Sequence, residues 1–111
     1  MIKKIMLILM LMVTSIVSFA AEEIYARKIL SIGCHHVDGT CYASLSGEPF
    51  GNTLSCPYKN VNQFRFDAST TNGKRTYASL YAAYLSKKFV DVYLDGCSSD
   101  GRPSIVWFHI Y

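Results

Sequence analysis

The sequence predicts a small β-rich α+β domain with five strands and a single helix. Three features lead to this prediction: short segments in which apolar and polar residues alternate, one segment with a helical repeat of apolar residues, and four cysteines. The chain has 111 residues, which suits one domain. Half of its residues are hydrophobic and only 17% are charged, which excludes an intrinsically disordered chain.

The first 20 residues have the pattern of a secretory signal peptide. Lys3 and Lys4 precede an apolar run over residues 5–13, and small residues follow at positions 18 and 20. We therefore expect cleavage before Ala21 and a single exported domain over residues 21–111, either secreted or periplasmic. The apolar run is shorter than the roughly 20 residues that cross a bilayer. No stable membrane span is expected after cleavage.

Removal of the signal peptide also changes the charge. The full chain carries 11 basic and 8 acidic residues, a net charge of +3. Without Lys3 and Lys4, nine basic residues face eight acidic ones, and the net charge is +1. Such a small charge offers little attraction for a phosphate backbone, so no nucleic-acid partner is expected.

Alternation of apolar and polar residues predicts five strands. They are expected at residues 24–34, 41–45, 63–67, 89–94 and 104–111. In the first strand, the residues at one face are Ile24, Ala26, Leu30 and Ile32; in the fourth, they are Val90, Val92 and Leu94. In the third strand, Phe64 and Phe66 share one face, and Arg65 and Asp67 share the other. Asp38-Gly39 is a strong hairpin signal between the first two strands.

A helix is expected from about Lys74 to Ser86. An apolar stripe at helical spacing predicts it, made of Tyr77, Leu80, Tyr81, Tyr84 and Leu85. We expect the tyrosines of this stripe to lie in the core with Phe64 and Phe66. The candidate N-cap residues are Thr70, Thr71 and Asn72.

The resulting order, β-β-β-α-β-β, is that of a five-stranded OB-like barrel. In this arrangement the helix between the third and fourth strands covers one open end. The alternative is an open α+β sandwich with the helix across one sheet face.

The four cysteines predict two disulfides, because an even number of cysteines in an exported chain meets an oxidising compartment. Of the three connectivities we favour Cys34–Cys41, across the hairpin, together with Cys56–Cys97. A metal site made by the first pair and the adjacent histidines is disfavoured, because a Cys-x6-Cys spacing does not suit zinc. Neither a metal nor a cofactor is expected.

Few residues suggest catalysis. A small secreted hydrolase could use His35, His36 or His109 as acid and base. We favour noncatalytic roles for them: two exposed loop histidines, and a half-buried strand histidine that shares its face with Ile105. Asp91 and Asp95 are four residues apart on a strand, roughly 13 Å, whereas a glycosidase pair needs roughly 5–10 Å. The chain is therefore expected not to be an enzyme.

Aromatic residues are the most informative excess, at 14% of the chain. Both faces of the last strand are apolar, which calls for a second covering layer. Tyr and Trp are favoured at interfaces because they combine an apolar body with a polar group. The candidates for a subunit interface or a ligand platform are Tyr93, Trp107, His109 and Tyr111. Packing within the domain is the alternative.

Residues 76–93 combine a helix of small and aromatic residues, a turn with two lysines and a strand of alternating valines. With the signal peptide, the disulfides and the element order, this resembles the B subunits of bacterial pentameric toxins, in the subtilase-cytotoxin and pertussis-like branch. The resemblance spans residues 24–95, and Cys41 lies where that branch also has a cysteine.

The resemblance implies a non-catalytic subunit that binds cell-surface carbohydrate, assembles into a homo-pentameric ring and carries a catalytic A subunit. The sugar-contacting serine of that branch follows paired tyrosines, whereas residues 21–25 here read Ala-Glu-Glu-Ile-Tyr. No glycan-contact residue is therefore transferred. The alternative is a protein-interaction or structural module without glycan binding.

Overall fold

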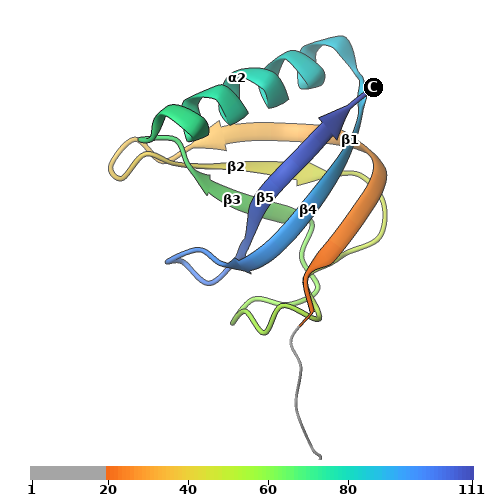
Figure 1. Ribbon diagram of the computed structural model, residues 1–111, viewed down its shortest axis with the longest axis vertical. Coiled ribbons are helices and arrows are strands. Elements are labelled where there is room, and N and C mark those ends of the chain that lie inside the picture. Colours follow the sequence, from red (N-terminus) through yellow and green to blue (C-terminus); the bar gives the residue numbers. More distant parts are fainter. Residues whose placement is uncertain (1–19) are drawn as a thin grey trace, which may run out of the picture.

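The computed structural model describes residues 20–111, which form five strands and one helix (Figure 1). The elements are β1 (Glu22–Cys34), β2 (Thr40–Leu45), β3 (Gln63–Asp67), α2 (Thr71–Ser86), β4 (Phe89–Cys97) and β5 (Pro103–Ile110). This order confirms the predicted β-β-β-α-β-β fold class. The predicted signal peptide, apart from Ala20, lies outside the described residues. Among residues 20–111, no helix is both long enough and apolar enough to cross a membrane.

The five strands close into a barrel in the order β1-β2-β3-β5-β4, and β4 pairs back with β1. The 13-residue β1 makes closure possible, because its first part pairs with β4 and its last part with β2. In Figure 1 it is the long strand that curves around the right-hand side. The one parallel pairing among these strands joins β3 to β5, through the single pair Arg65↔Ser104. The closed barrel rules out the open sandwich.

The barrel interior holds the hydrophobic core. The largest fully buried side chains include Phe64, Leu45 and Leu80, which come from two strands and the helix. On β4 the unbroken alternation places Val90, Val92 and Leu94 inside, as predicted. Full burial of one such side chain stabilises the fold by roughly 1.5–3 kcal/mol.

Two irregularities in β1 correct the predicted inner face of this strand. Ala26 and Leu30 were expected to face the core, but both are exposed, Leu30 by 58%. The register of β1 shifts around Ala26, where φ is 53°, and again around Leu30. A bulge inserts one residue and moves the following residues to the other face of the strand. Ile29 is therefore buried in place of Leu30.

The helix begins three residues earlier than expected, and Thr70 caps it. The Thr70 hydroxyl accepts a hydrogen bond from the backbone N–H of Gly73 at 3.0 Å. The last helical residue is Ser86, and Lys87 follows in the left-handed conformation. Such a residue commonly terminates a helix, because its backbone N–H bonds to carbonyls of the last turn.

The buried side of α2 is narrower than the predicted stripe. Only Gly73, Leu80 and Ala83 are buried, whereas Tyr81, Tyr84 and Leu85 are exposed. The cause lies at Gly73, where a Cβ atom would lie 1.7 Å from the carbonyl oxygen of Asp67. The helix backbone therefore touches the end of β3 at its first turn, and this contact turns Gly73, Leu80 and Ala83 rather than the tyrosines toward the barrel.

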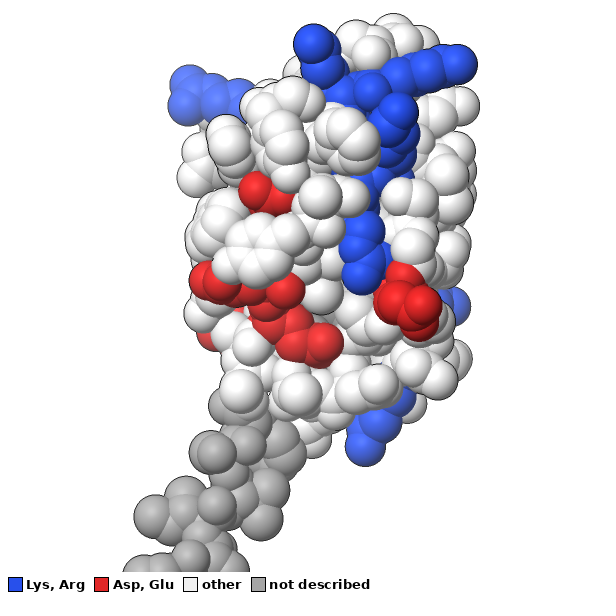
Figure 2. Space-filling view, turned by 90° about the vertical axis from the view of Figure 1, so that its right-hand side faces the viewer, with Lys and Arg blue, Asp and Glu red and all other residues white. Residues whose placement is uncertain are grey.

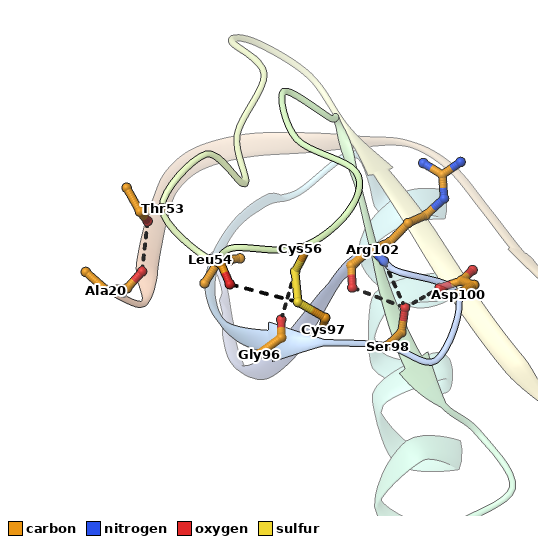
Figure 3. The surroundings of a disulfide bond; sticks show 9 residues. All are labelled: Ala20, Thr53, Leu54, Cys56, Gly96, Cys97, Ser98, Asp100 and Arg102. Carbon is orange, nitrogen blue, oxygen red and sulfur yellow. Dashed lines mark hydrogen bonds between the residues drawn. A yellow bond between two sulfur atoms is a disulfide. The ribbon is translucent and has the colours of Figure 1, made fainter. Parts of the chain in front are cut away.

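Two disulfides join described cysteines, in the favoured pairing. Cys34–Cys41 links register partners on β1 and β2. Cys56–Cys97 attaches the long loop between β2 and β3 to the end of β4 (Figure 3). The same loop is held by buried Leu54 and by Thr53, whose hydroxyl donates to the Ala20 carbonyl at 2.8 Å. Although irregular, this loop is thus part of the barrel's packed structure.

Candidate functional site

The four predicted site residues lie together on the outer face of β4 and β5. Register pairs Tyr93 with Trp107 and Asp91 with His109, while Phe89 and Tyr111 exchange two backbone hydrogen bonds. We call this surface the aromatic face; its members are Phe89, Asp91, Tyr93, Trp107, His109 and Tyr111. Ile105 was expected to share the face of His109 but is turned to the other side, because Val106 forms a bulge between the pairs Tyr93↔Trp107 and Leu94↔Ile105.

Stacked rings cover much of the aromatic face. The rings of Tyr93 and Trp107 are nearly parallel, with their centroids 5.7 Å apart. Phe89 stacks on Tyr111 at 5.9 Å, and His109 stacks on the same tyrosine at 5.1 Å. Trp107 remains 43% exposed. Of the six members of the aromatic face, Tyr93, Trp107, His109 and Tyr111 are the candidates that the sequence predicts, whereas Phe89 and Asp91 are placed beside them by the strand pairing.

Asp91 is the polar centre of the aromatic face. Its Oδ1 accepts hydrogen bonds from the backbone N–H of Ala26 at 2.7 Å and from the Tyr111 hydroxyl at 2.9 Å. Its Oδ2 lies 3.5 Å from Nδ1 of His109. The Ala26 amide first, then Tyr111 and His109, lower the pKa of Asp91, and the carboxylate in turn raises the pKa of Tyr111. The bulge at Ala26 therefore supplies the N–H that holds this carboxylate in its charged form.

The histidines named for a hydrolase lie in different parts of the barrel. His35 and His36 are exposed in the β1–β2 loop, where the His35 ring meets Tyr42 edge-on. His109 lies on the aromatic face beside Asp91. Among residues 20–111, no group of three or more His, Cys, Asp or Glu side chains could hold a metal ion. The described barrel therefore does not bring His109 together with His35 and His36.

A second surface, not predicted from the sequence, follows the seam between β3 and β5. Because these strands pair at one position, two hollows of about 320 and 300 Å³ flank it. Both hollows are lined by Arg65, Phe66, Asp67 and Ser104, so they share one wall. The rest of the first hollow is lined by Asp38, Thr40, Ser98 and Ser99, from the β1–β2 loop, β2 and the β4–β5 loop. We call this the seam groove; its hollows have the size of small ligand sites, which start at roughly 300 Å³.

Arg65 forms a rigid floor for the seam groove. Its residue is only 5% exposed, and the guanidinium lies 4.7 Å from the ring centroid of Tyr42. Nε donates to Asp100 at 2.9 Å and Nη1 to Gln63 at 3.0 Å. Within the described residues, Nη2 donates to no side chain or carbonyl. An arginine has five N–H donors, so this one retains donors for a ligand in the groove.

Two carboxylates, Asp38 and Asp67, line the groove together with Arg65, and a third, Asp100, pairs with this guanidinium without lining the hollows; all three are held in the charged form. The backbone N–H of Thr40 lowers the pKa of Asp38, and the Ser69 hydroxyl lowers the pKa of Asp67. Burial raises the pKa of Asp100, but the Ser98 hydroxyl and Arg65 outweigh it and lower the pKa overall. Figure 3 shows Asp100 and Ser98 side by side in the β4–β5 loop. The groove is therefore rich in hydrogen-bond acceptors and carries an excess of negative charge.

Comparison of the chain with known protein families, curated proteins and solved structures finds no match. The resemblance to toxin B subunits therefore stays a prediction. The aromatic face and the seam groove are the surfaces that bear on the function.

Proposed function

We propose that this protein is an exported, non-catalytic binding module that recognises uncharged carbohydrate in the seam groove. The observation that carries the proposal is the position of the groove, between the β1–β2 loop and the β4–β5 loop of an OB-like barrel. These loops and the strands beside them bind oligosaccharides or oligonucleotides in barrels of this kind.

The charge of the groove favours a sugar over a nucleic acid. Nucleic-acid sites neutralise phosphates with basic side chains. Here the lining has one buried arginine, already paired with Asp100, and the two carboxylates of Asp38 and Asp67, which would repel a phosphate. Sugar hydroxyls suit such a surface because each both donates and accepts. The Oδ2 atoms of Asp38 and Asp67 accept no hydrogen bond within the described residues and would receive sugar hydroxyls, while Nη2 of Arg65 would donate to a sugar oxygen.

The covalent structure fits an exported protein. Two disulfides are consistent with the periplasm or the extracellular space, where thiols oxidise. In this proposal the protein presents its seam groove to carbohydrate outside the cytoplasm. A catalytic A subunit, as the toxin resemblance implies, would be a separate chain carried by this module.

Substitution of Asp38 tests the proposal. Asp38→Asn keeps the oxygen that accepts from the Thr40 N–H but replaces the free Oδ2 by an amide donor. We expect calorimetry with neutral oligosaccharides to detect binding, and Asp38→Asn to weaken it at least tenfold. Asp95→Asn is the matched control, because Asp95 is exposed on β4 and does not line the groove. Absence of binding to any neutral or sialylated glycan would refute the proposal, as would binding that Asp38→Asn leaves unchanged.

A sialylated glycan provides a further arm of the same experiment. Its carboxylate would meet the carboxylates of Asp38 and Asp67, so we expect it to bind less tightly than the matching neutral glycan. Tighter binding of the sialylated form would retain carbohydrate recognition but overturn its assignment to this groove.

A second candidate function, a protein-interaction module, is favoured by the exposed rings of the aromatic face.

A further inference from the structure

We propose that the aromatic face is the contact surface between two copies of this chain, related by a two-fold axis. Together with Glu23, Ala26 and Lys28 of the neighbouring β1, its six members form three rows that cross β1, β4 and β5 in register. The outer rows are Glu23–Tyr93–Trp107 and Lys28–Phe89–Tyr111, and the middle row is Asp91–His109 next to Ala26. The inference is independent of carbohydrate binding, because none of these residues lines the seam groove.

The chemical composition of the face is that of an interface centre. Phe89, Trp107 and Tyr111 are all more than 40% exposed, and they lie beside exposed Val106. Interface centres are enriched in aromatic residues and depleted of charge. The one charge in the middle row, Asp91, already accepts two hydrogen bonds and lies near His109. It can therefore be covered without leaving an unpaired carboxylate.

The ends of the face carry opposite charges on the same strand. Glu23 occupies one outer row and Lys28 the other, on either side of the middle row. Figure 2 shows this side of the molecule, where basic groups gather mostly in the upper half and acidic groups mostly lower down. Lys28 Nζ lies 5.0 Å from the centroid of the Phe89 ring, so its ammonium is held over the face.

This arrangement is complementary to itself. Consider a two-fold axis that lies in the plane of contact and runs along the middle row. It places each outer row of one copy opposite the other outer row of its partner. The partner's Lys28 then lies opposite Glu23, and the partner's Tyr111 lies opposite Trp107. In a two-fold contact each such pair occurs twice. A closed ring instead needs two different surfaces on each copy, whereas here one surface contains both charges. The second copy is therefore the partner that fits this face.

The dimensions of the face set the strength of the contact. Three strands about 4.8 Å apart and three rows about 7 Å apart give a footprint of about 15 × 20 Å. A standard interface buries roughly 800 Å² per partner. The footprint of about 300 Å² is less than half of that area, so we expect a weak dimer whose dissociation is visible over an ordinary range of protein concentrations.

Exchange of the two charges tests the pairing. In sedimentation velocity of the exported protein over a range of concentrations, the wild type should show a monomer–dimer equilibrium. Glu23→Lys and Lys28→Glu should each raise the dissociation constant at least tenfold. The double variant should restore it to near the wild-type value, because each pair is then reformed with its signs exchanged. Lys74→Glu, on the exposed side of α2, controls for the change in net charge.

Circular dichroism of each variant would show that it folds. A protein that stays monomeric at all concentrations would overturn the proposal, as would a pentamer. Equally, a double variant that remains as weak as the single variants would show that Glu23 and Lys28 do not pair. Trp107→Ala should weaken the dimer in every charge background, because it removes the ring that faces the partner's Tyr111.

Discussion

Replacement of Leu80 by alanine is the sharpest test of how the helix docks on the barrel. Leu80 is fully buried, and it is the only large buried side chain on α2, since the others are Gly73 and Ala83. Leu→Ala in a core costs about 2–5 kcal/mol, the larger values where the cavity cannot collapse. Domains have only about 5–15 kcal/mol of stability. We therefore expect Leu80→Ala to remove a large part of the free energy of unfolding.

Leu85→Ala provides the matched control on the same helix. Leu85 is 61% exposed, so its removal should change the free energy of unfolding by no more than about 0.5 kcal/mol. Urea unfolding with the disulfides intact measures both variants, and the slope m should stay constant. In a thermal scan each lost kcal/mol corresponds to about 4–8 °C for a domain of this size. Equal costs for the two variants would refute the docking described here and return the helix to the predicted tyrosine-rich stripe.

Three further predictions concern covalent links, backbone contact and pH. Replacing Cys56 and Cys97 by alanine should cost about 4 kcal/mol in urea unfolding, against about 2.5 kcal/mol for Cys34 and Cys41, because the linked residues are 41 and 7 positions apart. Gly73→Ala should destabilise by more than about 1 kcal/mol, although alanine ordinarily stabilises a helix interior by about that amount; a more stable variant would contradict the contact with Asp67. The free energy of unfolding should be nearly constant between about pH 5 and pH 9. It should fall as the pH drops below about 4, because the folded-state pKa of Asp91 is lowered and the unfolded chain binds its proton more readily. Urea midpoints at pH 3 and 6 should then differ less in Asp91→Asn than in the wild type.

The fold class could be predicted because most of the strands and the helix have a recognisable local pattern of apolar and polar residues. The alternation of Val90, Val92 and Leu94 is unbroken, so their burial follows directly from the strand period. In β1 the same rule fails, because two bulges shift the phase and no residue type marks them. The buried side of α2 was missed for a related reason, since Gly73 makes a contact with the end of β3 that only the folded chain contains.

The two candidate surfaces differ in the same way. The aromatic face could be predicted because its residues lie on neighbouring strands in sequence and share one alternation. The seam groove could not, because it depends on a parallel contact between β3 and β5, which are separated by the helix and β4. Its one signal in the sequence was Arg65, between Phe64 and Phe66. This signal was not sufficient, because an arginine on a strand normally indicates a solvent-exposed face.

The division of β1 between two partner strands has a kinetic consequence. Glu22 pairs with Leu94, 72 positions later in the chain. Pairings between residues so far apart in sequence form slowly, because loop-closure entropy opposes them. The first strand to be synthesised is thus among the last to complete its hydrogen bonds, and the barrel closes only after β4 has been made. Until then the backbone groups of β1 that pair with β4 stay unpaired. The β1–β4 edge is therefore the place where a misfolded chain would first exchange strands with its neighbour.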